Sequence, residues 1–191
     1  MTDEKIYISA QELLQDSFEL GARVLESGFR PSFIIGVWRG GTPVGIAVQE
    51  ILDYFDVKTD HIAIRTSSYI GIGRRDKQVQ VHGLDYIVRN INAEDGLLIV
   101  DDVFDTGLSI AAIIKELTAR TRKNTPHDIR IATPWYKATN NETEREPDYY
   151  IHDTSHWLVF PHELRGLSAD EITNNKIGVR AVFKRLLDAP Q

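Results

Sequence analysis

The sequence predicts an α/β domain built on a mainly parallel β-sheet. Two continuous apolar runs, residues 33–37 and 97–100, are typical of strands buried on both faces, and residues 129–135 form a further expected strand. Apolar residues with the spacing of one helix face follow both runs. Strand and helix patterns therefore alternate, as expected for parallel strands joined by helices.

Length and composition limit the class of protein further. A chain of 191 residues is long enough to form one domain with a substantial core. It contains no cysteine, its start lacks the basic and apolar regions of a secretory signal, and no apolar run approaches the roughly 18 residues of a membrane span. We therefore expect a cytoplasmic protein without a membrane partner. The net charge of −6 argues against binding to nucleic acid.

The two ends of the chain predict structure outside this alternating region. A short strand is expected at residues 6–8, and Ser9 and Glu12 have the spacing of a capping box at the start of a helix. The predicted buried face of that helix consists of Leu14, Phe18, Ala22 and Leu25. Two short helices are expected from Asp170 onward. The second has an apolar face, interpreted as core or as a subunit contact, made of Val179, Val182, Phe183 and Leu186.

An acidic turn follows the apolar run at residues 97–100. Asp101, Asp102 and Asp105 lie directly before a helix start, where unpaired N–H groups and the positive end of the helix dipole favour a phosphate. Carboxylates beside a phosphate would repel the ligand unless they face another part of it. A sugar phosphate resolves this conflict, with its phosphate at the amides and its hydroxyls or a metal at the acids.

A basic turn follows the apolar run at residues 33–37. It contains Arg39-Gly40-Gly41, and Thr42 and Pro43 are predicted as the N-cap and first position of the next helix. Because the carboxyl ends of parallel strands meet at one edge of a sheet, we expect the basic and acidic turns to flank one site. An ordinary tight turn is the alternative interpretation.

Less regular segments lie between these elements. A strand is expected at residues 57–65, followed by a polar loop at 66–77, interpreted as a lid over an anion or as a solvated surface loop. Residues 84–88 are expected to pair with the strand before this loop, and residues 137–148 are expected to form an exposed loop. The histidines have no spacing typical of a zinc site.

Several enzyme classes fit the acidic turn poorly. Asp105-Thr106-Gly107 is similar to the aspartic protease triplet, but those proteins are all-β, whereas a helical pattern follows Gly107. Adjacent Asp101 and Asp102 do not form the acid-x-acid motif of aspartate-nucleophile phosphatases. No Gly-Lys-Ser/Thr sequence indicates a P-loop, and Gly71-Ile72-Gly73 lacks the third glycine of a dinucleotide-binding motif.

The stretch Val100–Ser109 carries two acids, an Asp-Thr-Gly triplet and a further hydroxyl between a strand and a helix. It resembles the phosphoribosyl pyrophosphate signature of the type I phosphoribosyltransferases, and the chain resembles their 6-oxopurine branch more closely. Arg39-Gly40-Gly41 resembles the pyrophosphate loop of the family, and Ser67-Ser68-Tyr69 resembles the start of its mobile catalytic loop. Lys137 and Trp157 resemble the pair that holds the purine in the hood.

This resemblance, which covers about residues 33–163, implies a Rossmann-like three-layer α/β/α core with a small hood. We expect one domain over residues 1–191, with the core at about 30–135 and the hood and tail at about 136–191 together with the N-terminal segment. The implied activity is transfer of a phosphoribosyl group from phosphoribosyl pyrophosphate to hypoxanthine, guanine or xanthine in purine salvage, by a homodimer or homotetramer. The alternatives are another acceptor base, or a non-catalytic regulatory protein that senses phosphoribosyl pyrophosphate.

The resemblance also implies roles for individual residues. The pyrophosphate would bind Arg39, Gly40 and Gly41. The 5′-phosphate would bind Asp105, Thr106, Gly107, Leu108 and Ser109. The ribose hydroxyls would bind Asp101 and Asp102, directly or through Mg²⁺. Asp105 would be the general base, and the purine would contact Lys137, Trp157, Leu158 and Glu163. A lid that excludes water would include Ser67, Ser68 and Tyr69.

Overall fold

The computed structural model of the protein describes residues 4–70 and 77–187, and these residues form two compact units. The larger unit contains residues 14–155, and the smaller unit contains the residues up to 13 and those from 156 onward. Within the described ranges no helix has both the length and the apolar content of a membrane span.

The larger unit consists of a sheet and its connecting helices. Its strands are β2 (Phe33–Trp38), β3 (Asp60–Ile70), β4 (Lys77–His82), β5 (Gly96–Val100), β6 (Val103–Phe104), β7 (Asp128–Tyr136) and β8 (Tyr149–Asp153). Its helices are most of α1 (Ala10–Glu26), then α2 (Gly41–Tyr54), α3 (Asp85–Asn90) and α4 (Leu108–Thr121), with the short 3₁₀ turns η1 (Arg122–Asn124) and η2 (Ala138–Asn140).

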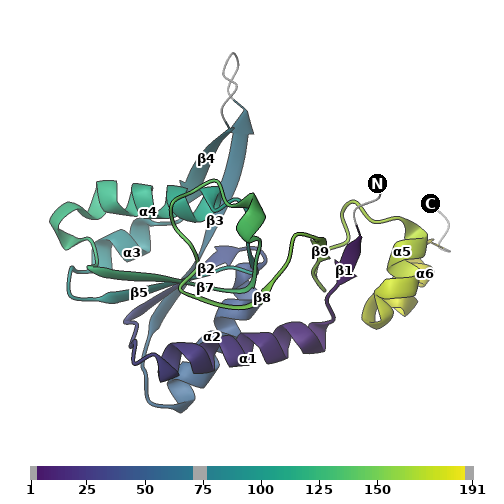
Figure 1. Cartoon of the computed structure of the whole chain (residues 1–191), viewed down its shortest axis with the longest axis horizontal. Helices are drawn as coiled ribbons and strands as arrows, with labels where there is room; N and C mark the ends of the chain where they lie inside the picture. Colours follow the sequence, from purple (N-terminus) through teal and green to yellow (C-terminus); the bar gives the residue numbers. More distant parts are fainter. Residues whose placement is uncertain (1–3, 71–76, 188–191) are drawn as a thin grey trace. The chain divides into compact units, whose positions relative to one another are not determined.

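The sheet has the strand order β4-β3-β2-β5-β7-β6, and β8 also pairs with β7. Every pair is parallel except β3 with β4. Helices α3 and α4 lie on one face of the sheet, and α1 and α2 lie on the other (Figure 1). The predicted α/β class with a mainly parallel sheet is therefore confirmed.

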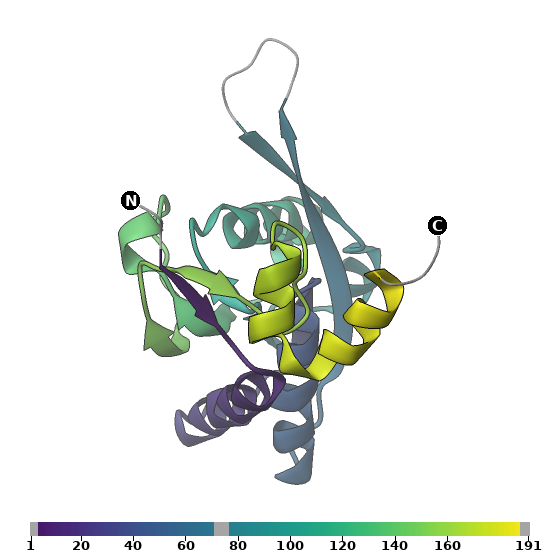
Figure 2. The same cartoon turned by 90° about the vertical axis from the view of Figure 1, so that its right-hand side faces the viewer.

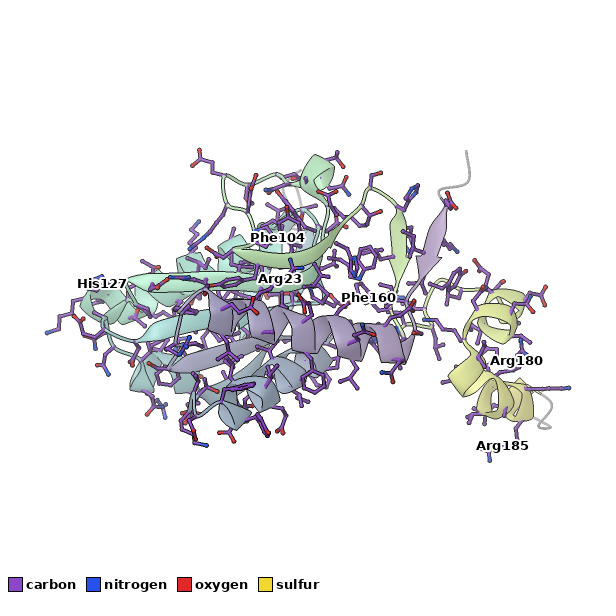
Figure 3. The ribbon with its side chains drawn as sticks, turned by 60° about the horizontal axis from the view of Figure 1, so that its bottom comes forward. Arg23, Phe104, His127, Phe160, Arg180 and Arg185 are labelled. Atoms are coloured by element: carbon purple, nitrogen blue, oxygen red, sulfur yellow. The ribbon has the colours of Figure 1, made fainter. Side chains whose placement is uncertain are left out.

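The core lies around the central strand β5. All four residues from Leu97 to Val100 are completely buried, as the continuous apolar run predicted for a strand covered on both faces. Helix α4 adds Ile110, Ile113 and Leu117 to the same core, in agreement with its predicted apolar face. Phe104 of β6, labelled in Figure 3, belongs to this cluster too.

The predicted buried face of α1 is wrong by one position. Leu14 and Phe18 are 44% and 39% exposed. The buried side instead contains Leu13, Ser17, Leu20 and Val24. A Cβ added to Gly21 would lie 2.3 Å from Cγ2 of Ile51 in α2, so the glycine turns inward to allow close helix packing. Sequence periodicity alone could not choose between two adjacent apolar stripes.

The polar loop expected at residues 66–77 is largely a β-hairpin. Strand β3 continues to Ile70 and pairs antiparallel with β4, and the hairpin projects from the larger unit (Figure 2). Residues 71–76 lie outside the described residues. The expected strand at residues 84–88 is wrong, because α3 occupies that position and β4 pairs with β3. Cross-strand bonds explain the polar composition, since Ser67 Oγ lies 3.0 Å from Nε2 of His82.

The smaller unit contains the chain's two ends. Its elements are β1 (Lys5–Tyr7), the start of α1, β9 (Trp157–Val159), α5 (Ala169–Asn175), the 3₁₀ turn η3 (Ile177–Val179) and α6 (Arg180–Leu187). Strands β1 and β9 pair in parallel. The capping box predicted at Ser9 and Glu12 is confirmed by reciprocal hydrogen bonds of 2.8 and 3.1 Å.

Helix α6 leaves much of its apolar side in solvent. Val182 and Leu186 are 50% and 63% exposed. The interpretation of this face as part of the core is therefore wrong for these two residues. Arg185 points away from the helices of the smaller unit (Figure 3), whereas Nε of Arg180 donates to the carbonyl oxygen of Thr173 in α5. The subunit contact stays a prediction.

Glu171 of α5 binds the N-terminal strand β1 through hydrogen bonds within the smaller unit. Its Oε1 accepts hydrogen bonds from Nζ of Lys5 at 2.6 Å and from the hydroxyl of Tyr7 at 3.0 Å. Its carboxylate also completes a capping box with Ser168 at the start of α5. The bond from Lys5, then that from the Ser168 backbone N–H and that from Tyr7, lower the pKa of Glu171 from 4.5 to about 2.

This pKa predicts a loss of stability in acid. Because the folded-state pKa is depressed, the stabilising contribution is fully present above pH 4.5 and is lost as the pH falls toward about 2. Urea unfolding at pH 6 and pH 3 should show a larger fall for the wild type than for Glu171→Gln. The exposed Glu144→Gln variant is the control, and an equal fall in all three proteins would contradict the prediction.

Candidate active site

The basic and acidic turns meet at the edge formed by the carboxyl ends of β2 and β5. These strands are parallel neighbours, so the residues that follow them leave the sheet side by side. A Cβ added to Gly40 would lie 1.7 Å from Oδ2 of Asp102, and one added to Gly41 would lie 2.4 Å from the carbonyl oxygen of Val100. The predicted approach of the two turns is therefore observed, and only glycine fits at these two positions without displacing a neighbour.

The start of α2 differs from its prediction. The helix begins at Gly41, and Gly40 is its N-cap without a side-chain hydrogen bond, so the assignment of Thr42 as N-cap is wrong. Thr42 is already helical, because its N–H bonds to the carbonyl of Arg39 at 3.2 Å. The peptide bond between Trp38 and Arg39 is cis. The glycines start the helix early because they allow its first turn to lie against the acids.

Asp101 and Asp102 form an acidic pair at this edge. Oδ1 of Asp101 accepts the backbone N–H of Asp102 at 2.9 Å. Burial, followed by the charge of Asp102, raises the pKa of Asp101 well above its ordinary value. A cation or ribose hydroxyls beside the pair would relieve this unfavourable arrangement. Two carboxylates suit Mg²⁺, which completes its coordination with water and substrate phosphates, and no larger group of metal-ligating side chains occurs among the described residues.

The start of α4 has the local geometry expected for a phosphate cradle. Gly107 is its N-cap, with a left-handed φ of 76°, and an added Cβ would lie 2.7 Å from both the Phe104 ring and Oγ1 of Thr143. Oγ1 of Thr106 accepts the N–H of Leu108 at 3.4 Å. Helix start, glycine and hydroxyls thus occur together at this edge of the sheet, as an anion site requires.

Both carboxylate oxygens of Asp105 accept hydrogen bonds from one short turn. Oδ2 lies 3.1 Å from Nζ of Lys137, and Oδ1 lies 2.8 Å from Nδ2 of Asn140. The side chain of Lys137 is 8% exposed, whereas that of Asp105 is 41% exposed. Asn140 was missed by the sequence analysis, which treated it as part of an exposed loop. No local sequence signal points to this contact, because Lys137 lies outside the 3₁₀ turn and Asn140 is 35 positions from Asp105.

The remaining predicted base-binding residues belong to the smaller unit. Trp157 is 59% exposed, and Leu158 is buried in β9. Oε2 of Glu163 accepts the backbone N–H of Phe160 at 3.2 Å. Trp157 and Glu163 line a cavity of about 410 Å³. Its other lining residues are Lys5, Val159, Arg165, Gly166 and Leu167. An exposed aromatic ring and a carboxylate that line the same cavity suit a flat base with N–H donors.

The predicted lid residues lie in a regular strand. Ser67, Ser68 and Tyr69 belong to β3, so their assignment to a loop is wrong. The side chains of Ser68 and Tyr69 lie outside the described part of the chain. Oγ1 of Thr66, in the same strand, lies 3.5 Å from Oγ of Ser109 in the first turn of α4. The hairpin therefore starts beside the site.

The fold and site define an α/β protein with a mainly parallel sheet, in which an acidic turn, a glycine turn and a helix start meet at the carboxyl edge. The family model of the phosphoribosyl transferase domain matches residues 5–165, and the chain belongs to this family. It is a phosphoribosyltransferase, an enzyme class whose substrates are phosphoribosyl pyrophosphate and a base.

Comparison with solved structures supports the fold. The chain is similar to a purine phosphoribosyltransferase from Pyrococcus horikoshii, with 28% identity, a TM-score of 0.65, and 86% of this chain and 97% of that chain covered. A hypothetical protein from Neisseria gonorrhoeae with bound ppGpp shares the fold at 17% identity and a TM-score of 0.71, covering 94% and 99%. The xanthine-guanine-hypoxanthine phosphoribosyltransferase from Helicobacter pylori also shares the fold, with 21% identity and a TM-score of 0.62. The similarity covers 82% of this chain and 92% of that chain. A search of curated proteins found no match.

Alanine substitutions at the two glycines of the basic turn should differ in their effect on stability, because the added Cβ atoms meet different neighbours. Gly41→Ala places a Cβ against backbone atoms and should lower the free energy of unfolding by about 1–3 kcal/mol. Gly40→Ala places it against the Asp102 carboxylate, which can rotate away, so stability should change by about 0.5 kcal/mol or less.

Gly40→Ala should nevertheless weaken binding of phosphoribosyl pyrophosphate about tenfold, because loss of one carboxylate contact costs about 1.4 kcal/mol. Urea unfolding and isothermal titration calorimetry measure the two effects. Equal destabilisation by both variants, with unchanged binding, would contradict this assignment of the turn.

Proposed function

We propose that the protein transfers the 5-phosphoribosyl group of phosphoribosyl pyrophosphate to a 6-oxopurine: hypoxanthine, guanine or xanthine. The products are a nucleoside monophosphate and pyrophosphate. The contact between buried Lys137 and Asp105 carries this proposal. An ammonium group only donates hydrogen bonds, so it pairs with a 6-oxo group and not with the 6-amino group of adenine. The similarity to a purine phosphoribosyltransferase supports a purine acceptor.

The donor's two phosphate groups need separate sites. Cleavage at the anomeric carbon leaves positive charge on the ribose ring and negative charge on the departing pyrophosphate. The backbone N–H groups at the start of α4 and the hydroxyls of Thr106 and Ser109 bind the 5′-phosphate. Arg39, with the backbone of Gly40 and Gly41, binds the pyrophosphate, which needs a closely approaching main chain.

Asp101 and Asp102 orient the ribose through its hydroxyls, directly or through Mg²⁺. Their carboxylates provide the oxygen ligands that Mg²⁺ prefers, and a bound Mg²⁺ would neutralise charge on the pyrophosphate. The backbone of Gly41 packs closely against Val100 and Asp101 and so holds the pyrophosphate turn beside these acids. The acids thus act on a part of the donor that the phosphate cradle does not bind.

The acceptor base is oriented by groups that contact its edges and face. Asp105 accepts the N7 proton as the opposite imidazole nitrogen bonds to the anomeric carbon, and Lys137 donates to O6. Trp157 stacks on the base, the Leu158 backbone contacts its far edge, and Glu163 completes the predicted base site. The hairpin that contains Ser67, Ser68 and Tyr69 acts as a lid that excludes water. The predicted hood at residues 136–191 is part of this proposal.

One assay tests the acceptor. The protein is incubated with phosphoribosyl pyrophosphate, Mg²⁺ and, separately, hypoxanthine, guanine, xanthine, adenine, uracil and orotate, and nucleotide formation is measured by chromatography. Turnover with an oxopurine and none with adenine supports the proposal. Turnover with another base alone would contradict it.

A regulatory protein is the second candidate, because a structure with the same fold holds ppGpp. Calorimetry with ppGpp and with phosphoribosyl pyrophosphate tests it. Binding of either molecule without turnover of any base would support this candidate against catalysis.

Asp105→Asn should separate the chemical step from donor binding. The amide has the same shape but cannot accept the N7 proton, so kcat should fall about 10²-fold or more. Affinity for phosphoribosyl pyrophosphate, measured by calorimetry, should stay within about threefold because the α4 amides are unchanged. Turnover of Asp105→Asn at the wild-type rate would contradict the role of Asp105 as general base.

Lys137→Met should affect the acceptor. The variant keeps a long buried side chain but cannot donate to O6, so KM for the oxopurine should rise about tenfold or more. Lys123→Met on the exposed η1 turn is the control. Steady-state kinetics with varied base measure both, and an unchanged KM would contradict the assigned contact.

A further inference from the structure

We infer that Asn140 is a positioning residue that holds the Asp105 carboxylate in its productive orientation while Lys137 binds the base. The inference rests on the proposed function, because it assigns Asn140 a task in the same reaction. It is carried by the 2.8 Å hydrogen bond from Nδ2 of Asn140 to Oδ1 of Asp105.

Lys137 and Asn140 lie at the two ends of one turn. Lys137 directly precedes η2, Asn140 ends it, and the N–H of Asn140 bonds to the carbonyl of Lys137 at 3.0 Å. Each of the two side chains donates to a different oxygen of the same carboxylate. The turn therefore holds Asp105 at both oxygens, and the two donors have different chemistry, one an ammonium and the other an amide.

The turn is attached to the acidic segment on both sides of Asp105. The N–H of Lys137 bonds to the carbonyl of Phe104 at 2.9 Å, and the N–H of Glu142 bonds to the carbonyl of Thr106 at 3.0 Å. These bonds fix the backbone of the turn relative to that of Asp105, so the position of the amide is set by the main chain and not by a flexible loop.

The two donors separate when a 6-oxopurine binds. Lys137 has a competing acceptor in O6 of the base, which draws its ammonium away from Oδ2, and Oδ2 is then the oxygen that takes the N7 proton. With 41% of its surface exposed, the Asp105 side chain could then rotate about its carbon–carbon bonds. The amide of Asn140 stays on Oδ1, because main-chain bonds hold its turn against the segment around Asp105. It keeps Oδ1 fixed and so keeps Oδ2 directed at the base.

Kinetics of Asn140 variants test this role. Asn140→Leu has similar size but no donor, and kcat with the best acceptor should fall about tenfold while KM for phosphoribosyl pyrophosphate stays within twofold. Asn140→Gln retains an amide and should recover part of the lost turnover. Asn124→Leu, at the end of the other short turn η1, is the matched control and should behave like the wild type. Wild-type kcat in Asn140→Leu would overturn the inference.

A double variant tests whether Asn140 acts through Asp105. In the Asp105→Asn background, Asn140→Leu should cause no further loss of kcat, because there is no carboxylate left to position. A purely structural effect would lower kcat by the same factor in both backgrounds and would overturn the inference. Circular dichroism of each variant checks that it folds.

A readout without turnover separates this inference from the proposed function. Crystal structures of the wild type and Asn140→Leu with a bound 6-oxopurine and no donor should show one Asp105 rotamer in the wild type and a rotated or alternate rotamer in the variant, because the base draws Lys137 away from Oδ2. If no base is turned over, the proposed function fails and the positioning role fails with it. If oxopurines are turned over but the Asp105 rotamer and kcat are unchanged in Asn140→Leu, the positioning role alone fails.

Discussion

The close approach of the Gly40-Gly41 backbone to the end of β5 is the constraint on which the site depends. Two strand-to-helix turns occupy the same edge of the sheet, and a side chain at either glycine would collide with Val100 or with Asp102. This approach brings a main chain that suits pyrophosphate next to carboxylates that suit ribose and a cation. It requires β2 and β5 to be parallel neighbours, and burial of residues 33–37 and 97–100 stabilises that pairing.

In the proposed function, the charges at this edge match the different parts of one donor molecule. The acidic pair is buried enough to raise the pKa of Asp101, an arrangement that destabilises the protein alone and favours a bound cation or hydroxyls. The helix start at Gly107 provides positive potential for a phosphate with no basic side chain. Asp105 lies between these regions and is held by Lys137 and Asn140, so its orientation depends on a turn that follows a different strand.

Sequence-based predictions succeeded where burial of apolar residues determines the local structure. They failed where contacts with neighbouring elements determine it. The apolar runs identified the central strands because only a strand covered on both faces tolerates continuous apolar residues. The α1 face was wrong because Gly21, facing α2, selects one of two adjacent stripes. The β3–β4 hairpin was missed because its polar residues, such as Ser67, are satisfied across the ladder and leave no apolar alternation. Thr42 has the chemistry of an N-cap, but helix α2 starts before it.

By itself the sequence determined the α/β class, the acidic and glycine turns, and the motifs that resemble the phosphoribosyltransferase family. These features are local, because a strand, a helix start or a flexible backbone position is encoded by adjacent residues. Tertiary structure alone decided how closely the two turns approach, which the sequence had predicted only to flank one site, and that Asn140 reaches Asp105. Such contacts join residues that are far apart in the chain, here 35 positions, and depend on strand order and on backbone bonds that no local pattern specifies.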